Sequence, residues 1–359
     1  MAIGAALWLA PWQTGAVRLS LRPVGYDALT GWEQDRLAAA VAPFLASCMA
    51  IAAKPDAAPL DPVPTSGDFG TVAEWRPLCR AAALLPTGDD AAARRFFADA
   101  FVPTLAGSSG TDEGLFTGYY EVQLTGSRRR ESPYQTPIYR RPADPTRYSR
   151  GEIEAGALSG RGLELLWVDD PIDAFLLHVQ GSGQVKLHSG GTVRIGYDGR
   201  NGRPFVPIGH LLVERGILPP EGLTMAGIRR WMVRHPAEAA VLRRENPSFI
   251  FFREVTGSGP IGSENVVLTP ERSLAVDRAF IPLGVPLWID AEQRYSPEAL
   301  RRLVIAQDTG GAIKGAVRGD LFWGAGETAA LRAGATNARG HYYLLLPRTV
   351  AARRFDAGI

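Results

Sequence analysis

Two aspartates in the C-terminal third of the chain stand next to short buried strands, and this pattern constrains the fold more than any other. Residues 303–306 are aliphatic and β-branched, as in a buried strand, and they lead to Asp308 at the start of a glycine-rich turn. Asp320 directly precedes a second apolar run, residues 321–323. Glycines let a ligand approach the backbone closely, and apolar neighbours can raise the pKa of a carboxyl group. Both aspartates are therefore candidate acid–base groups, or else turn residues that accept local backbone hydrogen bonds.

The composition predicts a globular, mainly β protein of two domains. The chain has 359 residues, of which 46% are hydrophobic and 21% charged. Its 40 glycines and 27 prolines favour many turns and short strands over a helix bundle. The formal net charge of +2 indicates no large basic surface, so we expect no nucleic-acid partner.

The pattern of apolar residues predicts helices first and strands later. Residues 30–100 read as helices, and residues 115–124 read as a strand with an internal glycine. The polar, proline-rich residues 127–145 indicate a boundary or a loop. Residues 172–183 are predicted to form a strand and its turn, and residues 185–197 a hairpin. Helical stretches are expected at residues 210–215 and 225–235.

Three short motifs suggest chemistry only weakly. Asp308-Thr309-Gly310 matches the aspartic-protease signature, but a pepsin-like fold needs a second copy and the chain has none. The glycine-rich turn at residues 180–184 is not followed by a convincing helix, so it is either a plain hairpin turn or a binder of sugar hydroxyls. Tyr119 and Tyr120 point to opposite faces of their strand, so one of them is free to line a groove.

Cysteine and histidine usage predicts no metal site and no cofactor. The two cysteines, Cys48 and Cys79, are too few for a structural zinc site, and they form either one disulfide or two buried thiols. None of the five histidines pair at a metal-ligand spacing. The apolar run at residues 2–10 is similar to the core of a signal peptide, although no basic residue precedes it and no cysteine follows it closely.

Several stretches together resemble one family of bacterial cell-wall enzymes, the membrane-bound lytic murein transglycosylase A family. The matching segments occur in the family's order and span about two thirds of the chain: FTGYYE (116–121), PIY (137–139), HVQGSG (178–183), NPSFIFF (246–252), LTPERSLAVD (268–277) and residues 308–324. The last two segments resemble the three-aspartate domain, whose aspartates would be Asp277, Asp308 and Asp320.

The resemblance implies a two-domain fold. A six-stranded double-psi β-barrel with N-terminal helices would be built from residues 20–126 and 248–350, and residues 127–247 would form a smaller inserted β domain. A groove between the two would hold a glycan strand, because binding sites tend to lie at domain interfaces.

The resemblance also implies a reaction, which is non-hydrolytic cleavage of the β-1,4 bond between N-acetylmuramic acid and N-acetylglucosamine to give 1,6-anhydro ends. Asp320 aligns with the family's catalytic aspartate and would act as acid and then base. Asp308 would support it, and Asp277 looks structural. Arg318 stands two residues before Asp320, where some members carry histidine, and is a candidate partner of the acid. The candidate substrate-binding residues are Tyr119, Gln180, Ser182 and Lys314.

The implied setting is periplasmic, with outer-membrane association left open because no lipobox cysteine is seen. In that oxidising compartment a Cys48–Cys79 disulfide is expected. The implied partners are peptidoglycan glycan strands and a cell-wall synthesis complex, and we expect a monomer. The alternative from another class is a non-catalytic glycan-binding protein, because double-psi barrels also occur in wall-loosening proteins that cleave nothing.

Overall fold

The computed structural model describes residues 18–63, 68–108, 110–219, 224–294 and 296–355. Its helices are α1 (Val41–Ala52), α2 (Val72–Ala83), α3 (Asp90–Ala100), α4 (Arg150–Glu154), α5 (Pro171–Gln180), α6 (Ile208–Glu214), α7 (Met225–Arg234), α8 (Pro236–Glu245), α9 (Glu327–Ala335) and α10 (Arg348–Phe355), with 3₁₀ turns η1 (Tyr26–Ala28), η2 (Trp32–Gln34) and η3 (Leu37–Ala40). Its strands are β1 (Leu19–Pro23), β2 (Phe101–Ser108), β3 (Gly114–Ser127), β4 (Thr136–Tyr139), β5 (Glu164–Val168), β6 (Ser182–Leu187), β7 (Thr192–Arg200), β8 (Ile250–Glu254), β9 (Ser273–Val276), β10 (Pro286–Gln293), β11 (Leu300–Asp308), β12 (Arg318–Ala325) and β13 (Asn337–Pro347).

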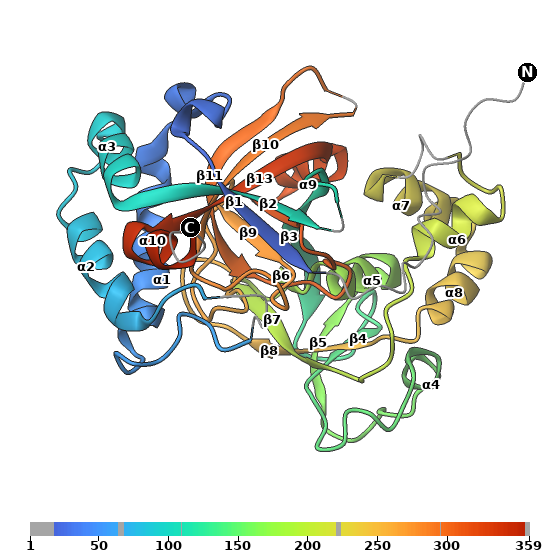
Figure 1. Ribbon diagram of the computed structural model, residues 1–359. Coiled ribbons are helices and arrows are strands. Elements are labelled where there is room, and N and C mark those ends of the chain that lie inside the picture. The colour runs from blue at the N-terminus through green and yellow to red at the C-terminus, as the bar shows by residue number, and fades with distance from the viewer. Residues whose placement is uncertain (1–17, 64–67, 109, 220–223, 295, 356–359) are drawn as a thin grey trace, which may run out of the picture.

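Six strands form a closed ring of backbone pairings in the larger part of the molecule. The order around the ring is β13, β10, β11, β9, β12, β3 and back to β13. The pairs β11–β9 and β12–β3 are parallel and the other four are antiparallel. Helices α1, α2, α3 and α10 lie together on one side of this ring (Figure 1). The predicted mainly β architecture with N-terminal helices is confirmed.

Strand β3 continues out of the ring into a second sheet. Its C-terminal half pairs in parallel with β6, beginning at Val122 opposite Gly183, and in antiparallel fashion with β5. Strands β6, β7 and β8 then pair in antiparallel order. Helices α4 to α8 lie in the same part of the molecule as this sheet (Figure 1). The smaller part of the molecule, predicted as a β domain, therefore also carries several helices. The predicted boundaries at residues 127 and 247 stay a prediction.

Residues 171–180 form helix α5, so the strand predicted there is wrong. The side chain of Asp170 caps the helix by accepting a hydrogen bond from Ile172 N at 2.7 Å, and Gly181 ends it with a left-handed φ of 81°. Leu177 packs against the second sheet, whereas Phe175 packs against the helices α6 to α8. Because α5 is buried on two sides, its sequence lacks the polar face of a surface helix. The hairpin β6–β7 and the helices α6 and α7 confirm the expectations for residues 185–197, 210–215 and 225–235, whereas the loop expected at residues 127–145 contains the short strand β4.

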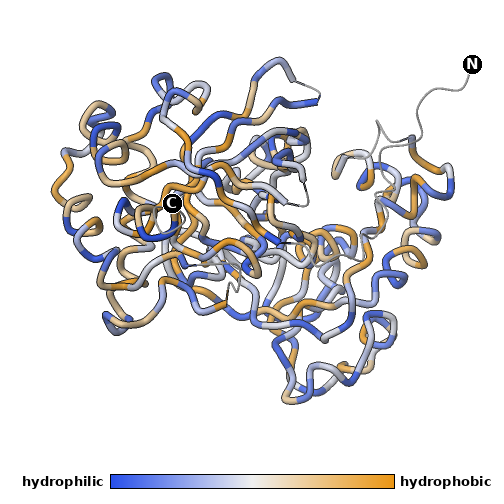
Figure 2. Tube along the Cα trace, viewed as in Figure 1, coloured by the Kyte–Doolittle hydropathy of each residue, from blue (hydrophilic) through white to orange (hydrophobic). Residues whose placement is uncertain are grey.

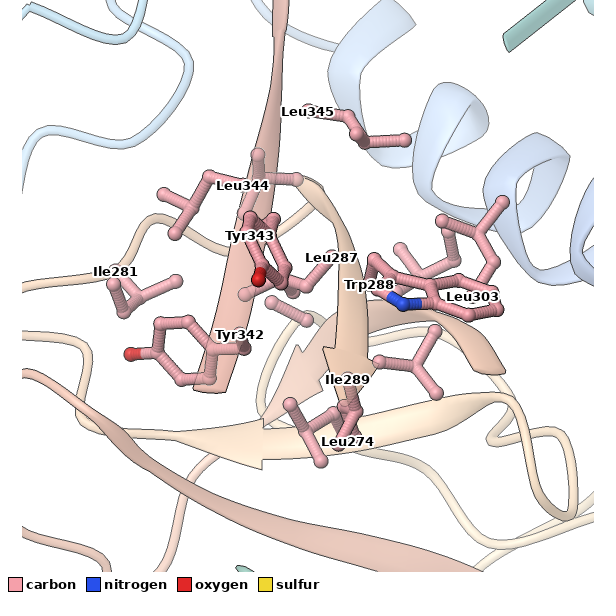
Figure 3. Close-up of a cluster of buried hydrophobic side chains, with 14 of the residues drawn as sticks. Leu274, Ile281, Leu287, Trp288, Ile289, Leu303, Tyr342, Tyr343, Leu344 and Leu345 are labelled. Atoms are coloured by element: carbon pink, nitrogen blue, oxygen red, sulfur yellow. The ribbon is translucent and has the colours of Figure 1, made fainter. Parts of the chain in front are cut away.

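The main hydrophobic core lies inside and beside the ring. Trp288 of β10 and Tyr342 of β13 are fully buried, and Leu303 of β11 lies next to Trp288 (Figure 3). Figure 2 shows hydrophobic residues running through these central strands. On the helical side, Cys48 of α1 and Cys79 of α2 are joined in a disulfide.

The apolar run at residues 2–10 lies outside the described residues. Within the ranges given above, no helix combines the length and the apolar character that a membrane span requires.

Candidate active site

Asp320 is held on β12 by a threonine of the neighbouring strand. The parallel register of β12 and β3 places Asp320 opposite Thr117, and the Thr117 hydroxyl donates a hydrogen bond to Asp320 Oδ1 at 2.5 Å. Arg318, on the same strand as Asp320, donates from Nη2 to Thr117 Oγ1 at 2.7 Å. The guanidinium also donates to the carbonyl oxygen of Leu115 at 3.2 Å. A chain of hydrogen bonds therefore runs from a cation through a hydroxyl to the carboxylate.

The surroundings of Asp320 favour its protonated form. Burial raises the pKa of Asp320, because the charged carboxylate loses contact with water. The positive charge of Arg318 and the hydrogen bond from Thr117 act in the opposite direction, and the nearby Asp308 carboxylate raises the pKa further. The net effect is a raised pKa, as a general acid requires at neutral pH.

Asp308 stands at the end of β11 and accepts several hydrogen bonds. Tyr119 donates its hydroxyl to Asp308 Oδ2 at 2.8 Å, and Ser263 donates to Oδ1 from its backbone N at 3.0 Å and its hydroxyl at 2.9 Å. Burial raises the pKa of Asp308, while these hydrogen bonds oppose the rise. Burial and the two aspartates raise the pKa of Tyr119 well above its usual value, so its hydroxyl stays a donor.

Strand β3 brings the two aspartates into one site. Thr117 and Tyr119 are two residues apart in β3, so their side chains point to the same face. Thr117 contacts Asp320 and Tyr119 contacts Asp308, although the two aspartates come from different strands of the ring. The structure therefore brings together three of the candidate residues: Asp320, Asp308 and Tyr119.

Lys314 and Asp277 lie in a separate pair. The Lys314 side chain is 71% exposed, and its Nζ lies 3.8 Å from Asp277 Oδ1. The buried Asp277 accepts hydrogen bonds from Gly315 N at 2.9 Å and from Ala279 N at 3.2 Å. Through the hydrogen bond from Gly315, Asp277 thus stabilises the turn that separates Asp308 from Asp320.

Gln180 and Ser182 lie where helix α5 meets strand β6. Gln180 Oε1 accepts a hydrogen bond from Tyr120 N at 3.0 Å, which links the end of α5 to β3. Ser182 begins β6 opposite Gly196 and is only 8% exposed. Gln180 therefore connects the smaller part of the molecule to the strand that carries Thr117 and Tyr119.

Thr117 and Ser263 are site residues that the sequence reasoning missed. Thr117 lies inside a family motif, but its contact with Asp320 depends on strand register across 203 positions of sequence. Ser263 lies in a loop 45 positions before Asp308. Neither position carries a local signal for such a contact. Among the described residues, no cluster of histidine, cysteine and acidic side chains has the arrangement of a metal site.

The molecule is thus a mainly β protein in which β3 holds two carboxyl groups at one site on a closed ring of strands. Residues 115–253 match the family described as the MltA specific insert domain, and residues 272–346 match the 3D domain. The Vibrio cholerae protein named membrane-bound lytic murein transglycosylase A is 35% identical over 260 residues, which is 70% of each chain.

Two solved structures extend the likeness to the fold. The structure of a membrane-bound lytic murein transglycosylase from Agrobacterium tumefaciens superimposes with a TM-score of 0.82 at 33% identity, covering 93% of this chain and 99% of that one. The structure of Escherichia coli MltA with bound chitohexaose gives a TM-score of 0.65 at 32% identity, covering 77% of this chain and 82% of that one. The chain therefore belongs to the membrane-bound lytic murein transglycosylase A family of enzymes, as predicted.

Proposed function

We propose that the protein is a peptidoglycan lytic transglycosylase that cleaves the β-1,4 bond between N-acetylmuramic acid and N-acetylglucosamine and leaves 1,6-anhydro ends. Family membership supports the substrate, because the relatives are named as murein transglycosylases and one was solved with a chain of amino sugars. Asp320 is the catalytic acid and base in this proposal. Its raised pKa supports the assignment.

The observation that carries the proposal is the direction of the hydrogen bonds around Thr117. A guanidinium can only donate, so the Arg318 contact occupies a lone pair of Thr117 Oγ1 and leaves the hydroxyl proton for Asp320 Oδ1. Asp320 Oδ1 is therefore an acceptor, and Oδ2 is the oxygen that carries the proton when the carboxyl group is protonated. The protein thus orients the acid and selects the oxygen that delivers the proton.

The reaction needs one carboxyl group in two steps. Asp320 Oδ2 gives its proton to the glycosidic oxygen as the C1–O bond breaks, and the freed sugar leaves with a 4-hydroxyl. The carboxylate then accepts the proton of the muramoyl 6-hydroxyl while that oxygen bonds to C1. The proton count balances without water. An internal nucleophile also has a large advantage in effective concentration.

The remaining candidates receive supporting roles. Asp308, fixed by Tyr119 and Ser263, stabilises positive charge that develops at C1 in the transition state. Gln180, Ser182 and Lys314, together with Tyr119, are the proposed contacts to the glycan strand.

We also propose the finer architecture that the family resemblance implies. The ring of six strands, with its two parallel pairs, is the double-psi β-barrel, built from residues 20–126 and 248–350. Residues 127–247 form the inserted domain, and the glycan strand binds in a groove between the two. The protein acts as a monomer in the periplasm, associates with the outer membrane and takes part in a cell-wall synthesis complex.

Replacing Asp320 by asparagine tests the function. The change keeps the shape of the side chain and removes its proton transfer, so the release of anhydro-muropeptides from purified sacculi should stop. Asp308→Asn should retain a measurable rate, because that variant keeps the acid. Mass spectrometry of the digests and a thermal unfolding curve for each variant give the readout. Full activity of a folded Asp320→Asn variant would refute the assignment, and a wild type that binds sacculi without forming anhydro ends would indicate a glycan-binding protein.

A further inference from the structure

A cavity lies in the smaller part of the molecule, outside the site of the two aspartates. Its volume is about 340 Å³, at the lower end for small-molecule sites. Helices α4, α5 and α8 and strands β4 and β5 contribute to its wall, and neither Asp308 nor Asp320 lines it. These elements lie together at the lower right of Figure 1.

Arg243 of α8 lines this cavity without a partner of its own. Its side chain is buried, with 8% of the residue exposed, and it forms no hydrogen bond or ion pair within the described ranges. Burial lowers the pKa of Arg243, while the charges of Glu154 and Asp170, neither of which is in ion-pair contact with Arg243, oppose this shift. No acidic side chain in the part of the chain that the structure describes contacts the guanidinium group of Arg243, so this arrangement favours a negatively charged ligand in the cavity.

The neighbouring Arg150 is also buried, but its guanidinium group has hydrogen-bond acceptors within the protein. Its Nε donates to the carbonyl oxygen of Asn246 at 3.0 Å and its Nη2 donates to that of Ser248 at 2.7 Å. The guanidinium also lies over the rings of Phe175 and Phe249, at 4.8 and 5.2 Å from their centres. Arg150 is therefore structural, in contrast to Arg243.

The charges around the cavity are strongly unbalanced. Glu154 is the acidic residue of the lining, and it already lies 3.4 Å from Arg150 and 3.5 Å from Arg244. Burial and the charge of Arg150 lower the pKa of His178, so that ring stays neutral. The basic residues of the lining are Arg130, Arg150, Arg243 and Arg244.

We propose that this cavity binds a carboxylate of an acidic peptide, with Arg243 as the principal contact. A guanidinium fork matches the two oxygens of a carboxylate. The wall also offers Trp167 and Tyr139 to the rest of a peptide, and the guanidinium of Arg130 lies 5.5 Å from the centre of the Trp167 ring.

The peptide in question is the stem peptide of peptidoglycan, and this part of the inference rests on the proposed function. Stem peptides carry free carboxylates, and they project from the glycan strand that Asp320 would cleave. Helix α5 connects the two sites. Its residues Ala174 and His178 line the cavity, and its last residue, Gln180, accepts a hydrogen bond from β3, the strand that holds Thr117 and Tyr119. The cavity is small, which suits one or two amino-acid residues better than a sugar chain.

Calorimetric titration of the full chain with a synthetic stem tetrapeptide tests the site without requiring cleavage. Wild type should bind the peptide, and Arg243→Gln should weaken binding about 10- to 100-fold, as expected for losing charged hydrogen bonds. Arg230→Gln, at an exposed position of α7, is the matched control and should bind like wild type. A peptide with every carboxylate amidated should bind wild type about 10- to 100-fold more weakly than the free peptide binds wild type. This last comparison needs no folded variant.

A cleavage assay on glycan strands stripped of peptide separates the two proposals. Arg243→Gln should cleave this substrate at the wild-type rate, because Arg243 is remote from the reacting bond. If wild type cleaves but does not bind the tetrapeptide, the peptide site is refuted and the proposed function stands. Equal binding of the free and amidated peptides, or undiminished binding by a folded Arg243→Gln variant, would also overturn the site.

Discussion

Glu264 offers a direct test of how burial of a carboxyl group couples the stability of this fold to pH. Its Oε2 accepts a hydrogen bond from the hydroxyl of Ser47 on α1 at 2.5 Å, next to the disulfide-bonded Cys48. Gln307 of β11 donates to the same hydroxyl at 2.9 Å. Burial raises the pKa of Glu264 from 4.5 to about 7, although Ser47 and the charge of Lys54 oppose the rise. Glutamine at this position would have nearly the same shape and no charge at any pH.

The sign and size of the effect follow from the two pKa values. The unfolded chain releases the Glu264 proton near pH 4.5, whereas the folded protein keeps it up to about pH 7. The stability contribution is therefore complete below pH 4.5 and is lost as the pH rises through 7. The pKa rises from 4.5 to about 7, and at about 1.4 kcal/mol per pH unit the largest possible loss of stability is about 3.5 kcal/mol. Because the residue is half-buried and keeps some contact with solvent, we expect a loss of about 1–2 kcal/mol.

Urea unfolding of wild type and Glu264→Gln at pH 4 and pH 8 measures this loss. The two proteins should have similar free energies of unfolding at pH 4, and the variant should be more stable by about 1–2 kcal/mol at pH 8. Glu238→Gln, at an exposed position of α8, serves as the control and should show no such difference. A Glu264→Gln variant that is less stable than wild type at pH 8, or one with an equal difference at both pH values, would refute the reasoning.

Two further changes test the site and the helical side of the fold. Arg318→Gln removes the donor to Thr117 and the charge that lowers the pKa of Asp320, so kcat/KM should fall about 10- to 100-fold and the alkaline limb of its pH profile should move to higher pH. Arg318→Lys keeps the charge, so its alkaline limb should stay near the wild-type position. If the alkaline limb of Arg318→Gln also stays at the wild-type position, the proposed influence of Arg318 on Asp320 is refuted. Replacing both Cys48 and Cys79 by serine should lower the free energy of unfolding by about 3–4 kcal/mol, because the bridge spans 31 positions of sequence. Two free thiols in unreduced wild type would contradict the disulfide.

Local patterns in the sequence were enough for much of the fold. Alternating and aliphatic runs identified β6, β7 and β11, and the capping and periodic patterns identified α2, α3 and α7. The six motif segments between residues 116 and 324, in their order along the chain, were enough for the family. The strands, the helices and each single motif are readable because each depends on residues that are close in sequence.

Helix α5 shows where local reading fails. Its sequence contains an aspartate cap, an initial proline and a terminal glycine, all of which are helix signals. Packing against the sheet on one side and against α6 to α8 on the other makes most of its surface apolar, so its residues read as a buried strand. The neighbours that bury α5 are far away in sequence, and local periodicity does not reveal them.

The sequence by itself determined which residues are candidates for chemistry: two aspartates beside strands, a tyrosine in a glycine-containing strand, and an arginine two positions before the acid. Only the tertiary structure decided which of them meet. The contacts from Thr117 to Asp320 and from Tyr119 to Asp308 cross 203 and 189 positions of sequence. They depend on β3 lying beside β12 in one closed ring of strands. Strand register is set by the packing of the whole core, so it is a property of the folded chain and not of any segment within it.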